Sequence, residues 1–333
     1  MLISYFLPQT ILTNEELEKE YNSPSWTASK IYRKTGIKSR HIVKDELASD
    51  LAVEAGKKLF AEHRISPSDI DFLLLCTQSP DYYLPTTACI VQDRLSIPKS
   101  AGAFDYNLGC SGYIYSLATA KGLLSAEIAK NVLLITAETY TKHIHPLDRS
   151  TRTVFGDGAT ATLLREEDIE KIGQFILVTD GKGAPNLIVL TGAMANPRTE
   201  ETAKENEDVN GNIRSMDNIY MNGPEIYAFT LRGVPDLIEK TLVKNNITMD
   251  QIDYVILHQA NKLVLESLRE KLEIPEEKYC IDIEDIGNTV SSTIPIALRR
   301  AIDKNLPQAK SGSKILIAGF GVGYSLGATV VII

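Results

Sequence analysis

Three residues of this sequence have side chains and neighbours suited to nucleophilic catalysis. Cys110 lies between glycines in the segment NLGCSG, just before apolar residues spaced as on one face of a helix. A thiol at a helix N-terminus is close to the positive end of the helix dipole, which should lower its pKa and favour the thiolate. His258 opens the segment HQAN, and Asn288 lies in IGNTV. Such a set could form a covalent intermediate at the cysteine and stabilise developing negative charge with the imidazole and the amide.

Each of these residues also has a plainer interpretation. Cys110 could be a buried cysteine in a glycine-rich turn, and His258 could be a structural hydrogen-bonding residue at a strand end. Asn288 could be a turn residue with left-handed backbone or a helix cap. Catalysis is therefore favoured only if the fold brings the three residues together.

Five segments of the first half of the chain recur in the same order in the second half. One match pairs HRISPSDIDFLLL at 63–75 with NNITMDQIDYVIL at 245–257, and another pairs NVLLITA at 131–137 with SKILIAG at 313–319. The distance along the chain between the two segments is the same in both pairs. Apolar strand-like runs alternate with amphipathic helical stretches in both halves, which indicates α/β units with helices on both faces of each sheet. We therefore expect two copies of one α/β unit packed as one body.

The repeat predicts the domain organisation and the place of the site. We assign residues 1–170 to the N-terminal half and residues 171–333 to the C-terminal half, with the polar stretch 197–215 as a surface excursion. The alignment of the halves sets Cys110 opposite Asn288, and it sets the strand end at Cys76 opposite His258. Because ligands bind beyond the carboxyl ends of strands in α/β sheets, we expect Cys110, His258 and Asn288 around one point.

Composition narrows the function classes. The chain has 43 acidic and 35 basic residues and a net charge of −8, which argues against a nucleic-acid partner. No apolar run is long enough for a membrane span, and the N-terminus has no signal-peptide pattern, so we expect a cytoplasmic protein. The cysteines form no CxxC pair or metal-like cluster, and three of them, Cys76, Cys89 and Cys280, lie in apolar runs where we expect buried thiols.

At these residues the sequence resembles the thiolase superfamily and, within it, the β-ketoacyl-acyl-carrier-protein synthase III family. The segments that carry the resemblance are TGIKSRHI at 35–42, FGDGATA at 155–161, HQAN at 258–261, GNT at 287–289 and GFGVG at 319–323. The resemblance implies an α/β thiolase-like fold, in which two duplicated βαβαβαββ halves pack as a five-layer αβαβα body. It also implies a homodimer.

The resemblance further implies a two-step condensation in the initiation of fatty acid synthesis. Cys110 would take an acyl group from acyl-CoA, and malonyl-acyl-carrier protein would then lose CO2 and attack the acyl-enzyme to give a 3-oxoacyl product. His258 and Asn288 would donate hydrogen bonds to the malonyl thioester oxygen. Phe320 would line the decarboxylation site, with core packing as the alternative, and Gly321 and Val322 would help to hold the acyl oxygen. The reaction uses no metal and no cofactor, since acyl-CoA is a substrate.

Further residues are assigned to substrate binding by the same resemblance. For CoA or its pantetheine arm they are Trp26, Lys34, Arg149, Gly223 and Asn261; for the acyl pocket it is Leu84, contributed by the partner subunit. The chain departs from the family where a tryptophan shortly precedes an arginine, because Trp26 is farther away and Lys34 replaces the arginine. Trp26 could equally be an interface or core residue. Basic residues expected near the carrier entrance are replaced by Ala228, Leu263 and Glu270.

Several related activities compete with this interpretation. Hydroxymethylglutaryl-CoA synthases need a glutamate where this chain has Gln78, and an amide cannot exchange a proton at neutral pH. Thiolases need a second cysteine near GFGVG, and none is present. Acyltransferases that do not condense tend to lose the asparagine, and a catalytically inactive relative would not be expected to keep all three residues. The alternative left open is a specialised condensing enzyme or acyltransferase of a secondary-metabolite pathway, acting on longer or unusual acyl groups.

Overall fold

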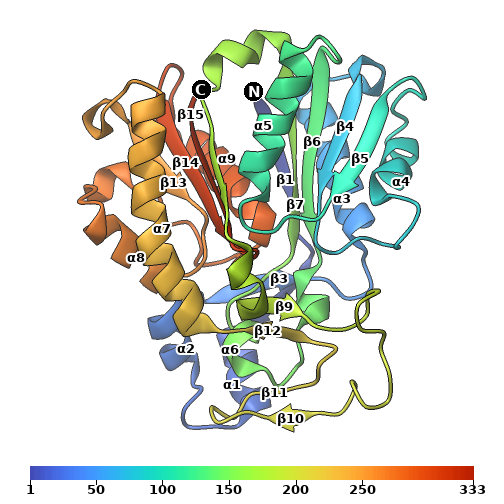
Figure 1. The fold of residues 1–333 in the computed structure, drawn as a ribbon, viewed down its shortest axis with the longest axis vertical. Coiled ribbons are helices and arrows are strands. Elements are labelled where there is room, and N and C mark those ends of the chain that lie inside the picture. Colours follow the sequence, from blue (N-terminus) through green and yellow to red (C-terminus); the bar gives the residue numbers. More distant parts are fainter.

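Five strands form the first sheet of the computed structural model, which describes all residues from 1 to 333. The strands are β1 (Leu2–Phe6), β4 (Phe72–Cys76), β5 (Gly102–Tyr106), β6 (Asn131–Glu138) and β7 (Gly158–Arg165). Their order is β1-β7-β6-β4-β5 (Figure 1). β4 is parallel to both β5 and β6, whereas β7 is antiparallel to β6 and β1. The carboxyl ends of β4 and β5 therefore point to the same edge of the sheet, where Cys110 follows.

The second sheet repeats the centre of the first. Its strands are β8 (Ile176–Thr179), β13 (Tyr254–Leu257), β14 (Lys314–Gly321) and β15 (Ser325–Ile332). β13 is parallel to β14, β14 is antiparallel to β15, and β8 is antiparallel to the far side of β15. β13, β14 and β15 thus correspond to β4, β6 and β7, while β8 takes the place of β1. The segment GFGVG at the end of β14 turns into the strand β15 rather than into a helix.

One strand that the repeat predicts is missing from the second sheet. We expected a strand before IGNTV, but the chain there makes only an isolated bridge between Val255 and Tyr279. The side chain of Gln259 takes the place of the next hydrogen bonds between backbone groups. Its Nε2 donates to Leu257 O at 2.6 Å, and its Oε1 accepts from the Asp282 N–H at 2.8 Å. Gln259 is fully buried, so these bonds satisfy backbone groups that a sheet would otherwise pair.

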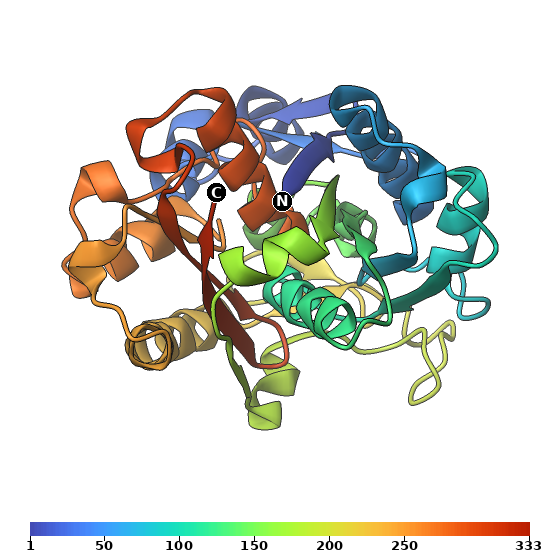
Figure 2. The same cartoon turned by 90° about the horizontal axis from the view of Figure 1, so that it is seen from above.

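Helices and sheets alternate in five layers, which confirms the predicted thiolase-like architecture (Figures 1 and 2). Two helices pack on the outer face of the first sheet, two lie between the sheets, and two pack on the second sheet. In that order they are α3 (Ala48–His63) and α4 (Thr87–Arg94), α5 (Gly112–Ser125) and α9 (Thr293–Asp303), and α7 (Gly223–Lys244) and α8 (Lys262–Lys271). None of the helices has the length and apolar composition that a membrane crossing requires.

The remaining elements lie below the sheets in Figure 1. They are β2 (Thr10–Thr13), α1 (Asn14–Tyr21), α2 (Ala28–Thr35), β3 (Ser39–Ile42), α6 (Arg149–Arg152), β9 (Leu187–Val189), β10 (Asn206–Glu207), β11 (Ile213–Arg214) and β12 (Ile219–Met221). Local capping explains the helix pair: Thr13 and Glu16 form a capping box before α1, Thr27 caps the start of α2, and Gly36 ends it with φ +73°. This pair presents Trp26 and Lys34 at the base of the molecule.

The core between the sheets explains why the middle helices are apolar. Tyr113, Leu117 and Leu124 of α5 are buried together with Ile294 and Leu298 of α9 in one cluster that contacts both sheets. The buried face of each of these helices is apolar, whereas Lys121 of α5 and Arg299 and Arg300 of α9 lie on the less buried side. The removal of one leucine from such a core costs about 2–5 kcal/mol of folding free energy. The prediction of a buried thiol is wrong for one of the three cysteines. Cys76 and Cys280 are buried, but Cys89 on α4 is exposed, because its side chain lies on the solvent side of a helix that covers the sheet edge.

Candidate active site

Cys110 lies in the turn that leads into α5, against the last residues of β14. A Cβ atom on Gly321 would lie 2.9 Å from both Cβ and Sγ of Cys110, and one on Gly319 would lie 2.7 Å from Cys110 O. Distances below 3.0 Å are too short for real side chains, so only glycine permits this approach. The central strand of the second sheet therefore touches the candidate nucleophile that follows the first sheet.

His258 follows β13, the neighbour of β14. Its backbone N–H donates to Ala318 O at 2.8 Å, which extends the strand pairing by one residue. Its ring Nδ1 lies 2.7 Å from the Thr293 hydroxyl, which also lies 3.1 Å from Val290 O. The hydroxyl hydrogen can serve either acceptor, so the imidazole can carry its own hydrogen on Nε2 or on Nδ1.

Asn288 is held by its backbone and by one atom of its side chain. Its N–H donates to Val154 O at 2.9 Å, and its carbonyl oxygen accepts from the Gly156 N–H at 3.0 Å. Its Oδ1 accepts from the Val290 N–H at 2.9 Å. Because this bond fixes the oxygen of the amide, the NH2 group is left to donate toward the cavity.

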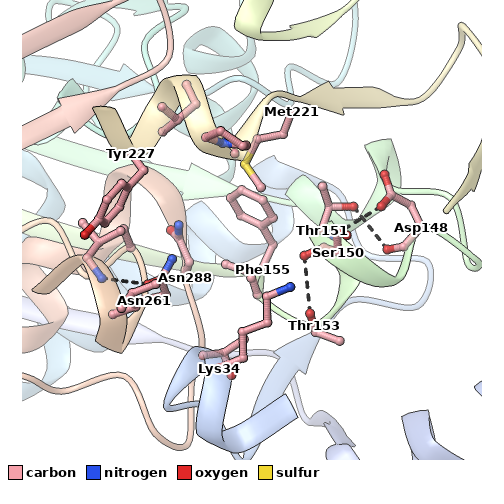
Figure 3. A pocket seen from close by; sticks show the side chains of 18 of the residues that line it. Lys34, Asp148, Ser150, Thr151, Thr153, Phe155, Met221, Tyr227, Asn261 and Asn288 are labelled. Atoms are coloured by element: carbon pink, nitrogen blue, oxygen red, sulfur yellow. Dashed lines mark hydrogen bonds between the residues drawn. The ribbon is translucent and has the colours of Figure 1, made fainter. Parts of the chain in front are cut away.

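One cavity of about 970 Å³ joins the three residues. Cys110, His258 and Asn288 all line it, and the aromatic ring of Phe320 stands edge-on to the His258 ring with centroids 5.6 Å apart. Figure 3 shows Asn288 close to the apolar side chain of Phe155, another residue of the cavity wall. The predicted convergence of residues from the two halves is thus present in the structure.

Burial sets the electrostatics of the site. It raises the pKa of the Cys110 thiol to about 12, with a further contribution from Glu138, and it lowers the pKa of His258 to about 3. The N–H groups of Val322 and of Cys110 itself act in the opposite direction on the thiol. The expectation that the helix dipole leaves a lowered pKa at Cys110 is therefore wrong, because desolvation of the thiolate outweighs the dipole. Both groups are neutral at neutral pH.

The residues predicted to bind CoA divide into two groups. Trp26, Lys34, Gly223 and Asn261 line the cavity, whereas Arg149 does not. The Arg149 guanidinium lies 5.6 Å above the Tyr21 ring instead. Lys34 Nζ lies 5.3 Å from the centroid of the Trp26 ring, so a cation already occupies one face of that indole.

Leu84 and Val322 also lie outside the cavity lining. Leu84 is 82% exposed, so it takes no part in the cavity of its own chain. Val322 packs against the cluster of apolar residues around Cys110 and acts on the thiol through its backbone N–H. Gly321 and Phe320, the other residues predicted near the acyl oxygen, line the cavity directly.

Comparison with known proteins places this site in a family. Residues 104–181 match the model of 3-oxoacyl-[acyl-carrier-protein] synthase III, and residues 242–333 match the model of its C-terminal part. A β-ketoacyl-[acyl-carrier-protein] synthase III of Clostridium perfringens is 38% identical over 98% of this chain and 96% of its own. The enzyme of the same name from Koribacter versatilis is 36% identical over 97% of this chain and 94% of its own.

The chain belongs to the 3-oxoacyl-[acyl-carrier-protein] synthase III family. Solved structures agree: one 3-oxoacyl-(acyl-carrier-protein) synthase III has a TM-score of 0.96 and 48% identity, covering 99% of this chain and 98% of its own. The enzyme from Pseudomonas aeruginosa has a TM-score of 0.86 and 28% identity, and the match covers 99% of this chain and 96% of that enzyme. The fold of this chain is therefore the fold of those synthase III structures.

One wall of the synthase III cavity was not foreseen from the sequence. The stretch 197–215, predicted as a surface excursion, contributes Asp208, Asn212 and Arg214 to the lining. Arg214 bridges Asp208 at 2.5 Å and the fully buried Asp148 at 3.0 Å. Hydrogen bonds from Asn212, from the Asn210 N–H and from Arg214 outweigh desolvation and lower the pKa of Asp208 to about 2. Ion pairs rather than apolar periodicity fix this wall, so hydrophobic patterning gave no signal for it.

The raised pKa of Cys110 predicts the pH dependence of its alkylation by iodoacetamide. Since only the thiolate reacts, the rate at Cys110 should keep rising from pH 7 through pH 9 without a plateau. Peptide mass spectrometry can follow Cys110 and the exposed Cys89 in the same sample, so that Cys89 serves as the internal reference. A plateau at Cys110 near pH 7 would mean that the thiol is ionised at neutral pH, contrary to this account.

Proposed function

We propose that this chain condenses an acyl-CoA primer with malonyl-acyl-carrier protein in the initiation of fatty acid synthesis. The single observation that carries the proposal is the meeting of Cys110, His258 and Asn288 in one cavity. The reaction is a decarboxylative Claisen condensation through an acyl-Cys110 intermediate, and its product is a 3-oxoacyl thioester with release of CO2. No chemical step needs a group that the chain and its two substrates do not supply.

Acyl transfer to Cys110 is the first step. The Cys110 thiol loses its proton to Nε2 of His258 while Nδ1–H donates to the Thr293 hydroxyl, 2.7 Å away. Sγ attacks the thioester carbonyl of acyl-CoA, and the N–H groups of Cys110 and of the Gly321–Val322 segment stabilise the oxyanion. The bond between the acyl carbon and the CoA sulfur then breaks, and the CoA thiolate leaves with the proton from His258.

Condensation follows in the same cavity. After CoA has left, the neutral His258 imidazole carries its hydrogen on Nε2, with the Thr293 hydroxyl donating to Nδ1. The malonyl thioester oxygen accepts hydrogen bonds from this Nε2–H and from the amide NH2 of Asn288, whose Oδ1 is already bonded to Val290. These donors stabilise the enolate that forms as CO2 leaves, and its carbon attacks the acyl carbon on Cys110. The carbon–sulfur bond to Cys110 breaks, and the Cys110 thiolate takes up the one proton that the condensation consumes, which comes from water. Phe320 beside His258 makes the site apolar, which favours loss of the charged carboxylate as neutral CO2.

The cavity gives the primer a path from the surface to the nucleophile. Gly223 and Asn261 are half-buried residues of its lining and suit the pantetheine arm, and the half-buried Trp26 and the exposed Lys34 also line it. We assign Lys34 to the phosphates of CoA, because Lys34 is exposed and lies next to Arg33 in the last turn of α2. Stacking of adenine on Trp26 would use the indole face that Lys34 does not cover.

Loading of acyl groups tests the proposed first step. Intact mass after incubation with acyl-CoAs of increasing length should show one acyl group on the wild-type chain and none on Cys110→Ala. Cys89→Ala removes an exposed thiol away from the cavity and should load as the wild type does. Short acyl groups should load best; loading of long or branched groups alone would instead support a specialised condensing enzyme, and no loading on Cys110 would contradict the proposal.

We also propose that two copies form a homodimer through β5. This strand is the free edge of the first sheet, and apolar side chains are exposed beside it: Phe104 is 38%, Tyr83 75% and Leu84 82% exposed. An open edge with apolar side chains favours pairing with another strand. Leu84 would then reach the acyl pocket of the partner subunit, which accounts for its absence from the cavity of its own chain.

The cytoplasmic location inferred from the sequence stays a prediction.

A charge on the β5 edge tests the proposed dimer. Phe104→Glu should convert a dimeric wild type into a monomer in sedimentation velocity at micromolar concentration, because a carboxylate would be buried between the copies. Val243→Glu places the same charge at a 75% exposed residue of α7 and should leave the dimer intact. A wild type that sediments as a monomer would overturn this assembly.

A further inference from the structure

Glu138, the last residue of β6, is a fully buried carboxyl group that the proposed reaction does not use. It forms no ion pair with any basic residue, and its partners are neutral groups. Its Oε1 lies 2.8 Å from the Ser291 hydroxyl, and its Oε2 accepts from the Gln78 N–H at 3.0 Å and lies 3.4 Å from the Ser79 hydroxyl. One carboxyl group therefore joins β6 to two separate loops.

The first of these loops carries Asn288. Ser291 belongs to the short 3₁₀ turn Val290–Ser292 that follows Asn288, and Val290 has φ +55°, a backbone conformation that β-branched residues avoid. The Val290 N–H donates to Asn288 Oδ1. The contact between Ser291 and Glu138 thus anchors a strained turn that orients the amide of Asn288.

The second loop lies behind the nucleophile. The side chain of Gln78 packs on Gly109, where an added Cβ would lie 2.4 Å from Gln78 Oε1. Gly109 directly precedes Cys110, and its carbonyl accepts from the Gly112 N–H at 2.7 Å in the turn that starts α5. Glu138 therefore has one connection to the turn of Asn288 and another to the turn of Cys110.

Burial raises the pKa of Glu138 to about 8. The titratable groups that face it are all acidic or neutral: Cys76 after β4, Cys110 before α5, Tyr140 after β6 and Asp157 before β7. With no cation to favour the charged form, the carboxyl group is protonated at neutral pH and can donate to the Ser291 hydroxyl. A charged Glu138 would raise the pKa of Cys110.

We propose that Glu138 is a positioning residue for the condensation, which as a neutral acid fixes the turn of Asn288 through Ser291 and spares Cys110 a neighbouring negative charge. The inference rests on the roles proposed above for Cys110 and Asn288. It separates two effects: the hydrogen bond to Ser291 serves the decarboxylation step, whereas the neutrality of the carboxyl group serves the ionisation of Cys110.

Removal of one hydroxyl tests the hydrogen bond. Ser291→Ala should load Cys110 from acyl-CoA within about 2-fold of the wild-type rate, yet lose about 10-fold or more in the condensation with malonyl-acyl-carrier protein. Ser292→Ala is the matched control: its hydroxyl is equally buried but contacts Thr136 Oγ1 at 2.8 Å and Gly158 O at 3.3 Å, not Glu138. It should affect the two steps equally. Equal effects of Ser291→Ala on both steps would overturn the proposal.

Replacement of the carboxyl group tests its neutrality. In Glu138→Gln the amide oxygen can accept from Gln78 and the NH2 group can donate to Ser291, as the protonated acid does. Its pH profile of Cys110 alkylation should shift about one unit to lower pH, since no charge forms on residue 138 above pH 8. A profile identical to that of the wild type would contradict the proposal. If Glu138→Gln does not fold, the comparison of the two serine variants decides.

These experiments distinguish a failure of the proposed function from a failure of the role proposed for Glu138. A wild-type chain that neither loads nor condenses would overturn the proposed function and this inference with it. A wild type that performs both steps, combined with a Ser291→Ala variant that shows no difference between them, would overturn only the role of Glu138.

Discussion

The site depends on the close approach of β14 to the turn that carries Cys110. Gly319 and Gly321 leave no room for a Cβ atom against Cys110 and Ser111, so the two sheets meet at the nucleophile itself. β13 lies beside β14 and brings His258 to the same level, and the pairing of Asn288 with the segment around Phe155 ties the third residue to the first half. Each half alone therefore lacks part of the proposed catalytic set.

Burial gives this site its chemical character. The Cys110 thiol and the His258 imidazole in the cavity are neutral at neutral pH, and so is the buried Glu138 carboxyl group outside the cavity lining, because each charged form would lose its hydration. In the proposed reaction, charge arises on His258 when it takes the Cys110 proton and on the substrate as the oxyanion or the enolate develops. In a site of low polarity, the fixed donors of His258, Asn288 and the backbone stabilise a developing oxyanion or enolate more strongly than water could.

The internal repeat predicted two α/β halves and the convergence of Cys110, His258 and Asn288, because equivalent strand ends carry equivalent loops, whereas the five layers were implied by the family resemblance. It failed where a side chain replaces a strand, as Gln259 does, and where ion pairs such as Arg214–Asp148 shape the wall. The pKa of Cys110 could not be predicted, since local spacing reveals a helix dipole but not the depth of burial. The boundary near residue 170 and the dimer stay predictions.

The central claim is that residues of the second half act on the acyl group held by the first. The most direct test preloads Cys110 with an acyl group and then measures release of CO2 and formation of the 3-oxoacyl product from malonyl-acyl-carrier protein. Asn288→Ala should load normally but lose both CO2 release and product by about 100-fold, the cost of a lost donor to a developing charge. Normal product formation by the loaded Asn288→Ala variant would contradict the account.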